Sequence, residues 1–460
     1  MKLKTKANLA MGAFLCACLV PSLGMLVLPE EAPAANQNLA QPPSLTTQDG
    51  GLNPRVLDEA TDYIADHFAL RQRLITVNAA LEAGLFRHSA QDNVLLGRDG
   101  WLFYRETVDD YLHTAPMTGR ELSGAARTLA LLTEYAESRG ARLVFTVAPN
   151  KASLYPEYLP YVGAPLAGEV DIDRLRPLLE AQGVAYADLF RPFREAGQPL
   201  YYAADSHWTE RGAALAHDTL TEALGLEGRV EWFAQPGHTE RTHRGDLYEM
   251  LYPAGDGLED AFVFDRPYAF TAVRPIRGPD DQRIETENPA QAGNLLMFRD
   301  SFGNSLYPLM ADSFGHALFS RSMPLQMTLL DETGADTVVI ELVERNLNYL
   351  SENPPIFPAP ERTLTGQPPQ GEAAAQIAAA EDSALPGYLR LDGALSGAVD
   401  EDSPIYVQMG ETLYEASPVG RGEGAPFTLY VPEGTALEDI RVLYLRDGQL
   451  AAAREAVLEQ

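Results

Sequence analysis

Apolar runs alternate with amphipathic helical patterns between about residue 54 and residue 350. Helices are predicted at Leu122–Arg139, Asp171–Gln182, Thr209–Leu224, after Ser301 and around Leu325–Glu332. Strands are predicted at Arg142–Ala148, Val184–Ala187, Asn294–Phe298, His316–Ser320 and Asp336–Leu342. Strands that alternate with helices form mostly parallel sheets, so we expect an α/β fold with helices on both faces of one sheet. We assign residues 54–353 to this domain and residues about 225–290, which lack the rhythm, to an irregular insertion.

The pattern changes after residue 353. Residues 354–375 are rich in Pro, Gly and Gln and predict a linker. Short strand-like pieces separated by turn residues follow at Gly387–Leu391, Pro404–Gln408, Phe427–Val431 and Arg441–Leu445. They predict a small all-β, sandwich-like domain at 376–460. Its role as a glycan-binding module or as a spacer stays open.

The N-terminus carries a targeting pattern. Three lysines in the first six residues precede an almost uncharged run at Ala7–Leu28, and Ala32-Pro33-Ala34 offers a small-residue cleavage site. The run is long for a signal peptide and about long enough to span a bilayer, although Pro21 interrupts it. Residues 1–35 therefore predict a cleaved signal peptide or a retained membrane anchor, followed by a tether at 36–53. Either alternative exports the rest of the chain, to the outer face of the cell membrane, the periplasm or the medium.

Composition limits the partners and the chemistry. The 460-residue chain has 65 acidic against 35 basic residues, a formal net charge of −30. Such a surface repels phosphate backbones, so nucleic acid is not an expected partner. Both cysteines, Cys16 and Cys18, lie in the N-terminal apolar run. The exported part is therefore expected to contain no disulfide and no cysteine-ligated metal.

A candidate nucleophile follows the predicted strand at Asn294–Phe298. Ser301 falls where that strand turns into a helix, a geometry that lifts the hydroxyl out of the sheet and places helix N–H groups beside a developing negative charge. Taken alone, the pattern fits equally a residue that only caps the helix, either Ser301 or Asp300.

A candidate proton relay precedes the helix at Thr209–Leu224. Asp205 and His207 are two residues apart, and in an extended segment this spacing directs both side chains to one side. The carboxylate would fix the imidazole tautomer while the imidazole takes the serine proton. The alternative is that Asp205 only stabilises the turn and that His207 is a packed or surface residue. The serine at a neighbouring strand end favours the relay.

Other residues have alternative interpretations. Trp101, Tyr201, Tyr202 and Trp208 suit either a sugar-stacking platform or the core. Lys151 follows a predicted strand end, where it would orient a substrate or pair with a structural acid.

Histidines and acids raise the alternative of a metal site, formed by His238, His243 and Asp246 together with Asp205 and His207. The sequence has no compact ligand motif such as His-Glu-x-x-His, so no metal is expected. It has no phosphate-cradling Gly-rich loop either, and no cofactor is expected. The remaining histidines, expected to be structural, are His67, His88, His113, His217 and His316.

Six motifs resemble, in the same order, those of the alginate O-acetyltransferase (AlgX/AlgJ)-like family, SGNH-hydrolase-like proteins also called DHHW proteins. They are Gly100-Trp-Leu-Phe-Tyr104, Val147-Ala-Pro-Asn-Lys151 with Tyr155-Pro-Glu-Tyr-Leu-Pro160, Asp205-Ser-His-Trp208, Arg244-Gly-Asp-Leu247, Arg299-Asp-Ser-Phe302 and Val343-Glu-Arg-Asn346. The resemblance runs from about Asn93 to Leu347. It implies a flavodoxin-like three-layer α/β/α domain whose triad is Ser301, His207 and Asp205.

One position departs from the wider hydrolase pattern. Arg299 stands where many SGNH hydrolases have the Gly of a Gly-Asp-Ser block, which leaves the oxyanion arrangement open. The backbone N–H of Ser301 is the first candidate donor. Asn150 and Arg345 are candidate side-chain helpers, because strand ends bring their loops near the site.

Similar enzymes transfer acetyl groups to exported polysaccharides through an acyl-serine intermediate, which splits one difficult transfer into two easier steps. The resemblance therefore implies an O-acetyltransferase with a polysaccharide acceptor and a membrane-bound O-acyltransferase as candidate acyl donor. Two alternatives remain: a carbohydrate esterase with the same triad, and a catalytically silent glycan-binding scaffold. A strongly acidic chain gives no reason to favour an anionic polymer such as alginate as the glycan.

Overall fold

A computed structural model of the chain describes residues 8, 11–12, 14–15, 19–20, 23–25, 27–28, 39–47, 50–226, 228–364, 366–381, 383–420, 422 and 424–459. Much of the predicted signal or anchor segment, including Cys16, Cys18 and the Ala32-Pro33-Ala34 site, lies outside these residues and stays a prediction. Within the described ranges, no helix is both long enough and apolar enough to cross a membrane.

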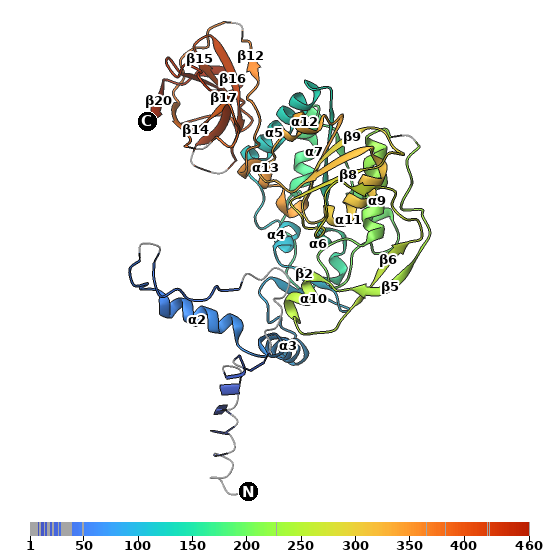
Figure 1. Ribbon diagram of the computed structural model, residues 1–460. Helices are drawn as coiled ribbons and strands as arrows, with labels where there is room; N and C mark the ends of the chain where they lie inside the picture. Colours follow the sequence, from blue (N-terminus) through green and yellow to red (C-terminus); the bar gives the residue numbers. More distant parts are fainter. Residues whose placement is uncertain are drawn as a thin grey trace.

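The central sheet has the strand order β4-β3-β11-β9-β10-β8-β7 (Figure 1). Its strands are β3 (Arg142–Ala148), β4 (Tyr186–Ala187), β7 (Thr271–Ala272), β8 (Arg283–Glu287), β9 (Asn294–Phe298), β10 (His316–Ser320) and β11 (Thr337–Val343). Neighbours from β4 to β10 run parallel, whereas β8 pairs antiparallel with β10 and with β7. The sheet is thus mostly parallel with an antiparallel edge, and β9 lies in its interior between β11 and β10.

The central strands are buried on both faces. Alternate side chains of β3 enter opposite apolar clusters: Val144 packs in one, whereas Phe145 and Val147 pack in the other. The first cluster includes residues of α9 (Glu210–Ala223) and α11 (Gly303–Ser313), and the second includes residues of α5 (Gly119–Glu137) and α7 (Asp171–Ala181). Helices therefore cover each face, as the continuous apolar strands require.

Further helical segments are α2 (Val56–His67), α3 (Arg71–Leu81), the π-helical turn η1 (Glu82–Phe86), α4 (Glu106–Leu112), α6 (Lys151–Leu154), η2 (Pro156–Tyr158), α8 (Phe190–Glu195), α10 (Asp246–Leu251), α12 (Leu329–Thr333), η3 (Glu344–Asn346) and α13 (Tyr349–Glu352). Side chains fix where the long helices begin. Thr118 forms a capping box with Glu121 at α5, and Thr209 accepts the N–H of Gly212 at α9. The helix predicted around Leu325–Glu332 is only α12, because bends and turns occupy the residues before Leu329.

Residues 225–290 contain more regular structure than the predicted irregular insertion. β5 (Gly237–His243) and β6 (Glu259–Phe264) pair antiparallel, with α10 between them in the chain. β8 then joins the central sheet. Its sequence alternates, so that only Ile284 and Thr286 of the strand are buried, which is the pattern of an antiparallel strand with one exposed face. A separate pair, β1 (Val94–Leu96) and β2 (Leu102–Tyr104), is also antiparallel.

The C-terminal residues form a continuous sheet of order β19-β18-β15-β16-β17-β14-β13-β20, with β12 paired to β16. Its strands are β12 (Glu361–Arg362), β13 (Ala374–Ala379), β14 (Tyr388–Ser396), β15 (Ile405–Met409), β16 (Thr412–Pro418), β17 (Ala425–Pro432), β18 (Arg441–Arg446), β19 (Gln449–Ala452) and β20 (Glu455–Glu459). β16 pairs with β15 along its length and with β17 at Ser417 and Pro418, so it joins the two halves. A curled sheet therefore replaces the predicted sandwich (Figure 1).

A buried ion network attaches this sheet to the α/β part. The carboxylate of Glu415, on β16, has no exposed surface. Arg127 of α5 donates to it through Nε at 2.6 Å and Nη2 at 2.8 Å, and Arg362 donates through Nε at 2.6 Å. Buried charges require partners of this kind.

Candidate active site

Ser301 lies in the tight connection between β9 and α11, at the carboxyl end of an interior parallel strand, where ligand sites of such sheets form. The carboxylate of Asp300 fixes this connection. One of its oxygens accepts the N–H of Phe302 at 2.8 Å and the other accepts the N–H of Val343 at 2.7 Å. Ser301 itself caps no helix N–H in the described structure, since its hydroxyl faces a histidine instead. The simple capping alternative thus applies to Asp300.

The ring of His207 lies between Ser301 and Asp205. Its Nε2 is 2.9 Å from the Ser301 Oγ, and its Nδ1 is 2.7 Å from the Asp205 Oδ1. An ionised carboxylate only accepts hydrogen bonds, so Nδ1 carries the hydrogen and the neutral ring has its Nε2 lone pair directed at the serine hydroxyl. In this tautomer the imidazole can take the hydroxyl proton.

Asp205 is held by donors on both carboxylate oxygens. Oδ1 accepts the ring and the backbone N–H of His207, whereas Oδ2 accepts the His243 ring at 2.9 Å and the N–H of Asp246 at 3.0 Å. Burial alone would raise the pKa of Asp205, but the hydrogen bonds from His207 and His243 hold it well below its usual range. For His207, burial opposes the charged ring, yet the Asp205 hydrogen bond and charge raise its pKa.

Lys151 lies beneath the Asp205 segment. Its Nζ donates to the carbonyl oxygens of Leu102 at 2.7 Å, Ala203 at 2.7 Å and Asp205 at 2.9 Å, and the residue is only 2% exposed. All three ammonium donors are therefore used by backbone acceptors. Burial lowers the pKa of Lys151 to about 7, although the charge of Asp205 raises it. The ammonium group contacts backbone oxygens and forms no direct ion pair with a described residue, so it has no donor left over for a substrate.

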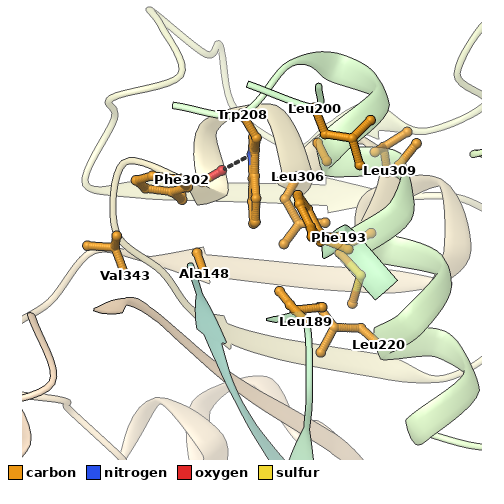
Figure 2. Packing of buried hydrophobic residues seen from close by; sticks show 14 of the residues in the cluster. Ala148, Leu189, Phe193, Leu200, Trp208, Leu220, Phe302, Leu306, Leu309 and Val343 are labelled. Atoms are coloured by element: carbon orange, nitrogen blue, oxygen red, sulfur yellow. Dashed lines mark hydrogen bonds between the residues drawn. The ribbon is translucent and has the colours of Figure 1, made fainter. Parts of the chain in front are cut away.

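Trp208 lies in the core and connects the segment of Asp205 and His207 to the residues that follow Ser301. Its indole N–H donates to the Phe302 carbonyl at 3.1 Å (Figure 2). The same N–H is 2.9 Å from the Ser305 Oγ. Trp208, Tyr201 and Tyr202 are 1%, 3% and 5% exposed, and Trp101, at 8%, stacks on Tyr158. The burial of these rings favours the core interpretation over the sugar-stacking platform, because they pack against protein.

The candidate oxyanion helpers differ in their placement. Asn150 is fully buried, with its amide Nδ2 donating to Asp110. Arg345 packs over the rings of Phe302 and Tyr104, and its Nη1 is buried without a hydrogen-bond partner. Within the described residues, the N–H of Ser301 also has no acceptor. Ser301 and Arg345 thus have donors left over, whereas the Asn150 amide donates to Asp110.

Arg299 turns away from the serine. Its guanidinium donates to the carbonyl oxygens of Pro279 at 2.7 Å and Asp281 at 3.2 Å, and to the Asn304 side chain at 2.6 Å. Burial lowers its pKa to about 10. Arg299 therefore anchors the 279–281 loop and the first turn of α11.

The acids and histidines of the alternative metal site only partly come together. Ligand atoms of Asp205, His207 and Asp246 lie within 4.8 Å of one another, and His243 contacts Asp205. Asp246 accepts the N–H and hydroxyl of Ser206 at 2.7 and 2.6 Å, so the group is mutually hydrogen-bonded. His238 lies elsewhere and pairs with acids at the surface, Glu240 and Asp265.

Two contacts of the relay were not predicted from the sequence. The sequence suggests His243 only as a metal ligand, and it indicates no part in the relay for Asp246, which lies in the Arg244-Gly-Asp-Leu247 motif. The motif was the available signal. The contacts join loops about 40 residues apart, a separation that no local pattern reports.

Comparison with known proteins places the chain among related sequences. Residues 94–258 match the family described as SGNH hydrolase-like domain, acetyltransferase AlgX. The chain is 25% identical over 254 residues to the probable alginate O-acetylase AlgJ of Pseudomonas fluorescens, and 29% identical over 210 residues to that of Pseudomonas syringae pv. tomato. These alignments cover 52% and 44% of this chain and 61% and 51% of the relatives. The chain thus spans about half to three fifths of their length.

Among solved structures, Bacillus cereus PatB1 with a sulfonyl adduct aligns at 15% identity and a TM-score of 0.43, covering 56% of this chain and 97% of that one. The O-acetyltransferase domain of Pseudomonas putida AlgJ aligns at 21% identity and a TM-score of 0.37, covering 56% and 92%. The matched family segment contains Asp205 and His207 and ends before Ser301. The AlgX/AlgJ resemblance predicted from the motifs is thus confirmed, and residues 94–258 are similar to the SGNH hydrolase-like domain of that family.

Proposed function

We propose that the chain is an O-acetyltransferase that modifies an exported or cell-surface polysaccharide through an acyl-serine intermediate. The proposal rests on two hydrogen-bond distances at the His207 ring. Its Nε2 is 2.9 Å from the Ser301 Oγ, and its Nδ1 is 2.7 Å from the Asp205 Oδ1. The names of the AlgJ relatives support acetyl transfer to a polysaccharide.

In the first step, the Ser301 Oγ attacks the acyl carbonyl carbon while the His207 Nε2 takes the hydroxyl proton. The Asp205 carboxylate stabilises the imidazolium that forms. When the tetrahedral intermediate collapses, the bond to the donor group breaks and His207 returns the proton to that leaving group. The products are the ester of Ser301 and the protonated leaving group, so atoms and protons balance.

In the second step, a sugar hydroxyl attacks the ester carbonyl after losing its proton to His207, and Ser301 leaves with that proton. The acceptor gains the acetyl group and the triad is restored. A membrane-bound O-acyltransferase is the proposed source of the acyl group. The predicted N-terminal segment, as signal or anchor, would place the reaction outside the cytoplasm.

The proposed oxyanion donors are the N–H of Ser301 and the guanidinium of Arg345. Both have donor capacity that no described residue uses, and α11 begins two residues after Ser301, with its N-terminus adding positive potential. Donors fixed before reaction stabilise the developing negative charge without reorganising.

The proposed domain plan is a signal or anchor at 1–35, a tether at 36–53, a flavodoxin-like SGNH domain at 54–353, a linker at 354–375 and a β module at 376–460. Helices on both faces of the parallel sheet support the first domain. The separate curled sheet and its own apolar core support the second.

One experiment separates the proposal from its rivals. The purified chain is incubated with an aryl acetyl ester, with and without oligosaccharides, and acetylated sugar and free acetate are measured. Acetylated sugar that Ser301→Ala abolishes supports the transferase. Ser301-dependent release of acetate alone identifies an esterase. No Ser301-dependent product, together with full biological activity of Ser301→Ala, identifies a scaffold and refutes catalysis by this serine.

A further inference from the structure

Asp205 contacts two imidazole rings, and the relay uses only one of them. On the side away from His207, the Asp205 Oδ2 lies 2.9 Å from the Nε2 of His243. Because the carboxylate accepts, Nε2 carries the hydrogen in this contact. His243 comes from the end of β5, a strand far from the Asp205 segment in the chain, so the contact spans two separate parts of the structure.

The His243 ring is itself held in place. It stacks on Tyr202 with ring centres 3.7 Å apart and planes inclined by 11°. The Tyr202 hydroxyl in turn donates to the carboxylate of Glu210, at 2.6 Å from Oε2, in the first turn of α9. The ring therefore has a fixed orientation, and its N–H points at the oxygen of Asp205 that His207 does not occupy.

A carboxylate that accepts hydrogen bonds on only one of its oxygens can rotate away from its histidine. Asp205 accepts two hydrogen bonds on Oδ1, both from His207. It accepts two more on Oδ2, one from the His243 ring and one from the N–H of Asp246. The Oδ2 donors thus oppose the rotation that would break the short contact to the His207 ring. Such supporting hydrogen bonds commonly decide how well a reactive group is aligned.

We propose that His243 is a positioning residue that holds the second oxygen of Asp205 and thereby fixes the His207 ring against Ser301. The inference rests on the proposed function, because it assigns support to that same relay. His243 touches no reacting atom. Its effect passes through Asp205.

The surroundings of His243 also favour its charged form. Tyr202 packs on the ring, and the carboxylates of Asp205, Glu210 and Glu259 face it from the relay loop, α9 and β6. Burial lowers the pKa of His243, but the hydrogen bond to Asp205 and these charges outweigh it and raise the pKa. A cationic His243 draws on the same negative charge that favours protonated His207. The pKa of His207 is therefore lower with a charged His243 than with a neutral donor in its place.

The test is the rate at which a fluorophosphonate labels Ser301 in the full chain, measured from about pH 5 to pH 9. His243→Gln keeps an N–H donor and removes the charge; His243→Leu removes both. We expect His243→Gln to label within about threefold of wild type at high pH. We expect His243→Leu to be about 10- to 100-fold slower, the size of a lost hydrogen bond to a charged group.

The second readout is the acidic limb of the pH–rate profile, the range in which labelling slows as the pH falls. In His243→Gln it should move to higher pH by at least about 0.5 unit, the shift that two charges about 6 Å apart produce even at the dielectric constant of water. A merely structural residue would not move this limb. His238→Gln is the matched control, since His238 lies on the same strand, is exposed and pairs only with surface acids.

The outcomes are distinguishable. Labelling that persists in Ser301→Ala would refute the proposed function itself. Ser301-dependent labelling with wild-type rates and an unmoved limb in both His243 variants would overturn only the positioning role. If His243→Leu fails to fold by circular dichroism, the limb of His243→Gln decides alone.

Discussion

The ammonium group of Lys151 lies 2.9 Å from the carbonyl oxygen of Asp205. A buried hydrogen-bond donor therefore holds the backbone of the residue whose carboxylate contacts His207. Lys151→Met would leave three buried carbonyl groups without their donor. We expect a loss of about 3 kcal/mol or more in the free energy of unfolding, and slower Ser301 labelling in the molecules that remain folded. Chemical denaturation measures the first effect. Arg191→Met, at an exposed site on α8, is the control and should cost under about 0.5 kcal/mol.

Lys151 is the only lysine after residue 6 of the chain. A pKa of about 7 would make an accessible lysine unusually reactive toward acylating reagents, but this one is 2% exposed. We expect amine-reactive esters to leave Lys151 unmodified in the native protein and to modify it readily in denaturant. Peptide mass spectrometry reads both states. Rapid native modification would contradict the buried placement.

Members of a catalytic triad act as a unit, and Ser301, His207 and Asp205 form the proposed one. Ser301→Ala and His207→Ala should therefore reduce the turnover of an acetyl ester by similar factors, on the order of 10³ or more, because either change leaves no activated nucleophile. Asp205→Asn should be milder than either. Initial rates with an aryl acetate measure the three variants. Unequal effects of the serine and histidine changes would show that they do not work together.

The pH profile should follow the neutral form of His207. The hydrogen bond and charge of Asp205 raise the pKa of this ring above its usual value despite its burial, and a protonated imidazole cannot accept the serine proton. Acylation should therefore increase with pH through a midpoint above 6.5. Single-turnover acylation across the pH range tests this, and an acidic limb at or below pH 6 would contradict it.

Glu415 neutralises two arginines in a position with no exposed surface. Glu415→Gln would remove the buried carboxylate that Arg127 and Arg362 share and leave them only Glu134 as an acidic partner, at a cost of about 3 kcal/mol in unfolding free energy. Thermal unfolding should also lose cooperativity, because this network joins the curled sheet to α5. Glu195→Gln removes an exposed pair with Arg191 and should cost less than about 1 kcal/mol. Equal melting temperatures for the two variants would exclude the network as a support.

The strands that the sequence predicted best are those buried on both faces. The predicted ranges Arg142–Ala148, Asn294–Phe298 and His316–Ser320 coincide with β3, β9 and β10, because a continuous apolar run ends abruptly at polar residues. β8 is not predicted, because a strand with one exposed face mixes charged and apolar side chains. The curled C-terminal sheet was predicted only as short strands, since pairing between distant strands leaves no local trace.

The candidate site divides in the same way. The spacing of Asp205 and His207 and the strand end at Ser301 predicted which groups would face one another, because both patterns are local. Burial is not local. The sequence allowed Trp208 and Lys151 to contact a substrate. In the structure both are buried, and Trp208 donates to the Phe302 carbonyl whereas Lys151 donates to the Asp205 carbonyl.

The interior position of β9 bears on how the chain can be shortened. Ser301 follows a strand whose neighbours β10 and β11 come later still in the sequence, whereas the match to the family model stops at residue 258. A fragment cut there would keep the base and its carboxylate but lose the hydroxyl and the middle of the sheet. Two separately expressed pieces divided near that point could bring His207 and Ser301 together again only by reassembling the sheet. Renewed fluorophosphonate labelling of Ser301 would therefore report directly that the two pieces associate.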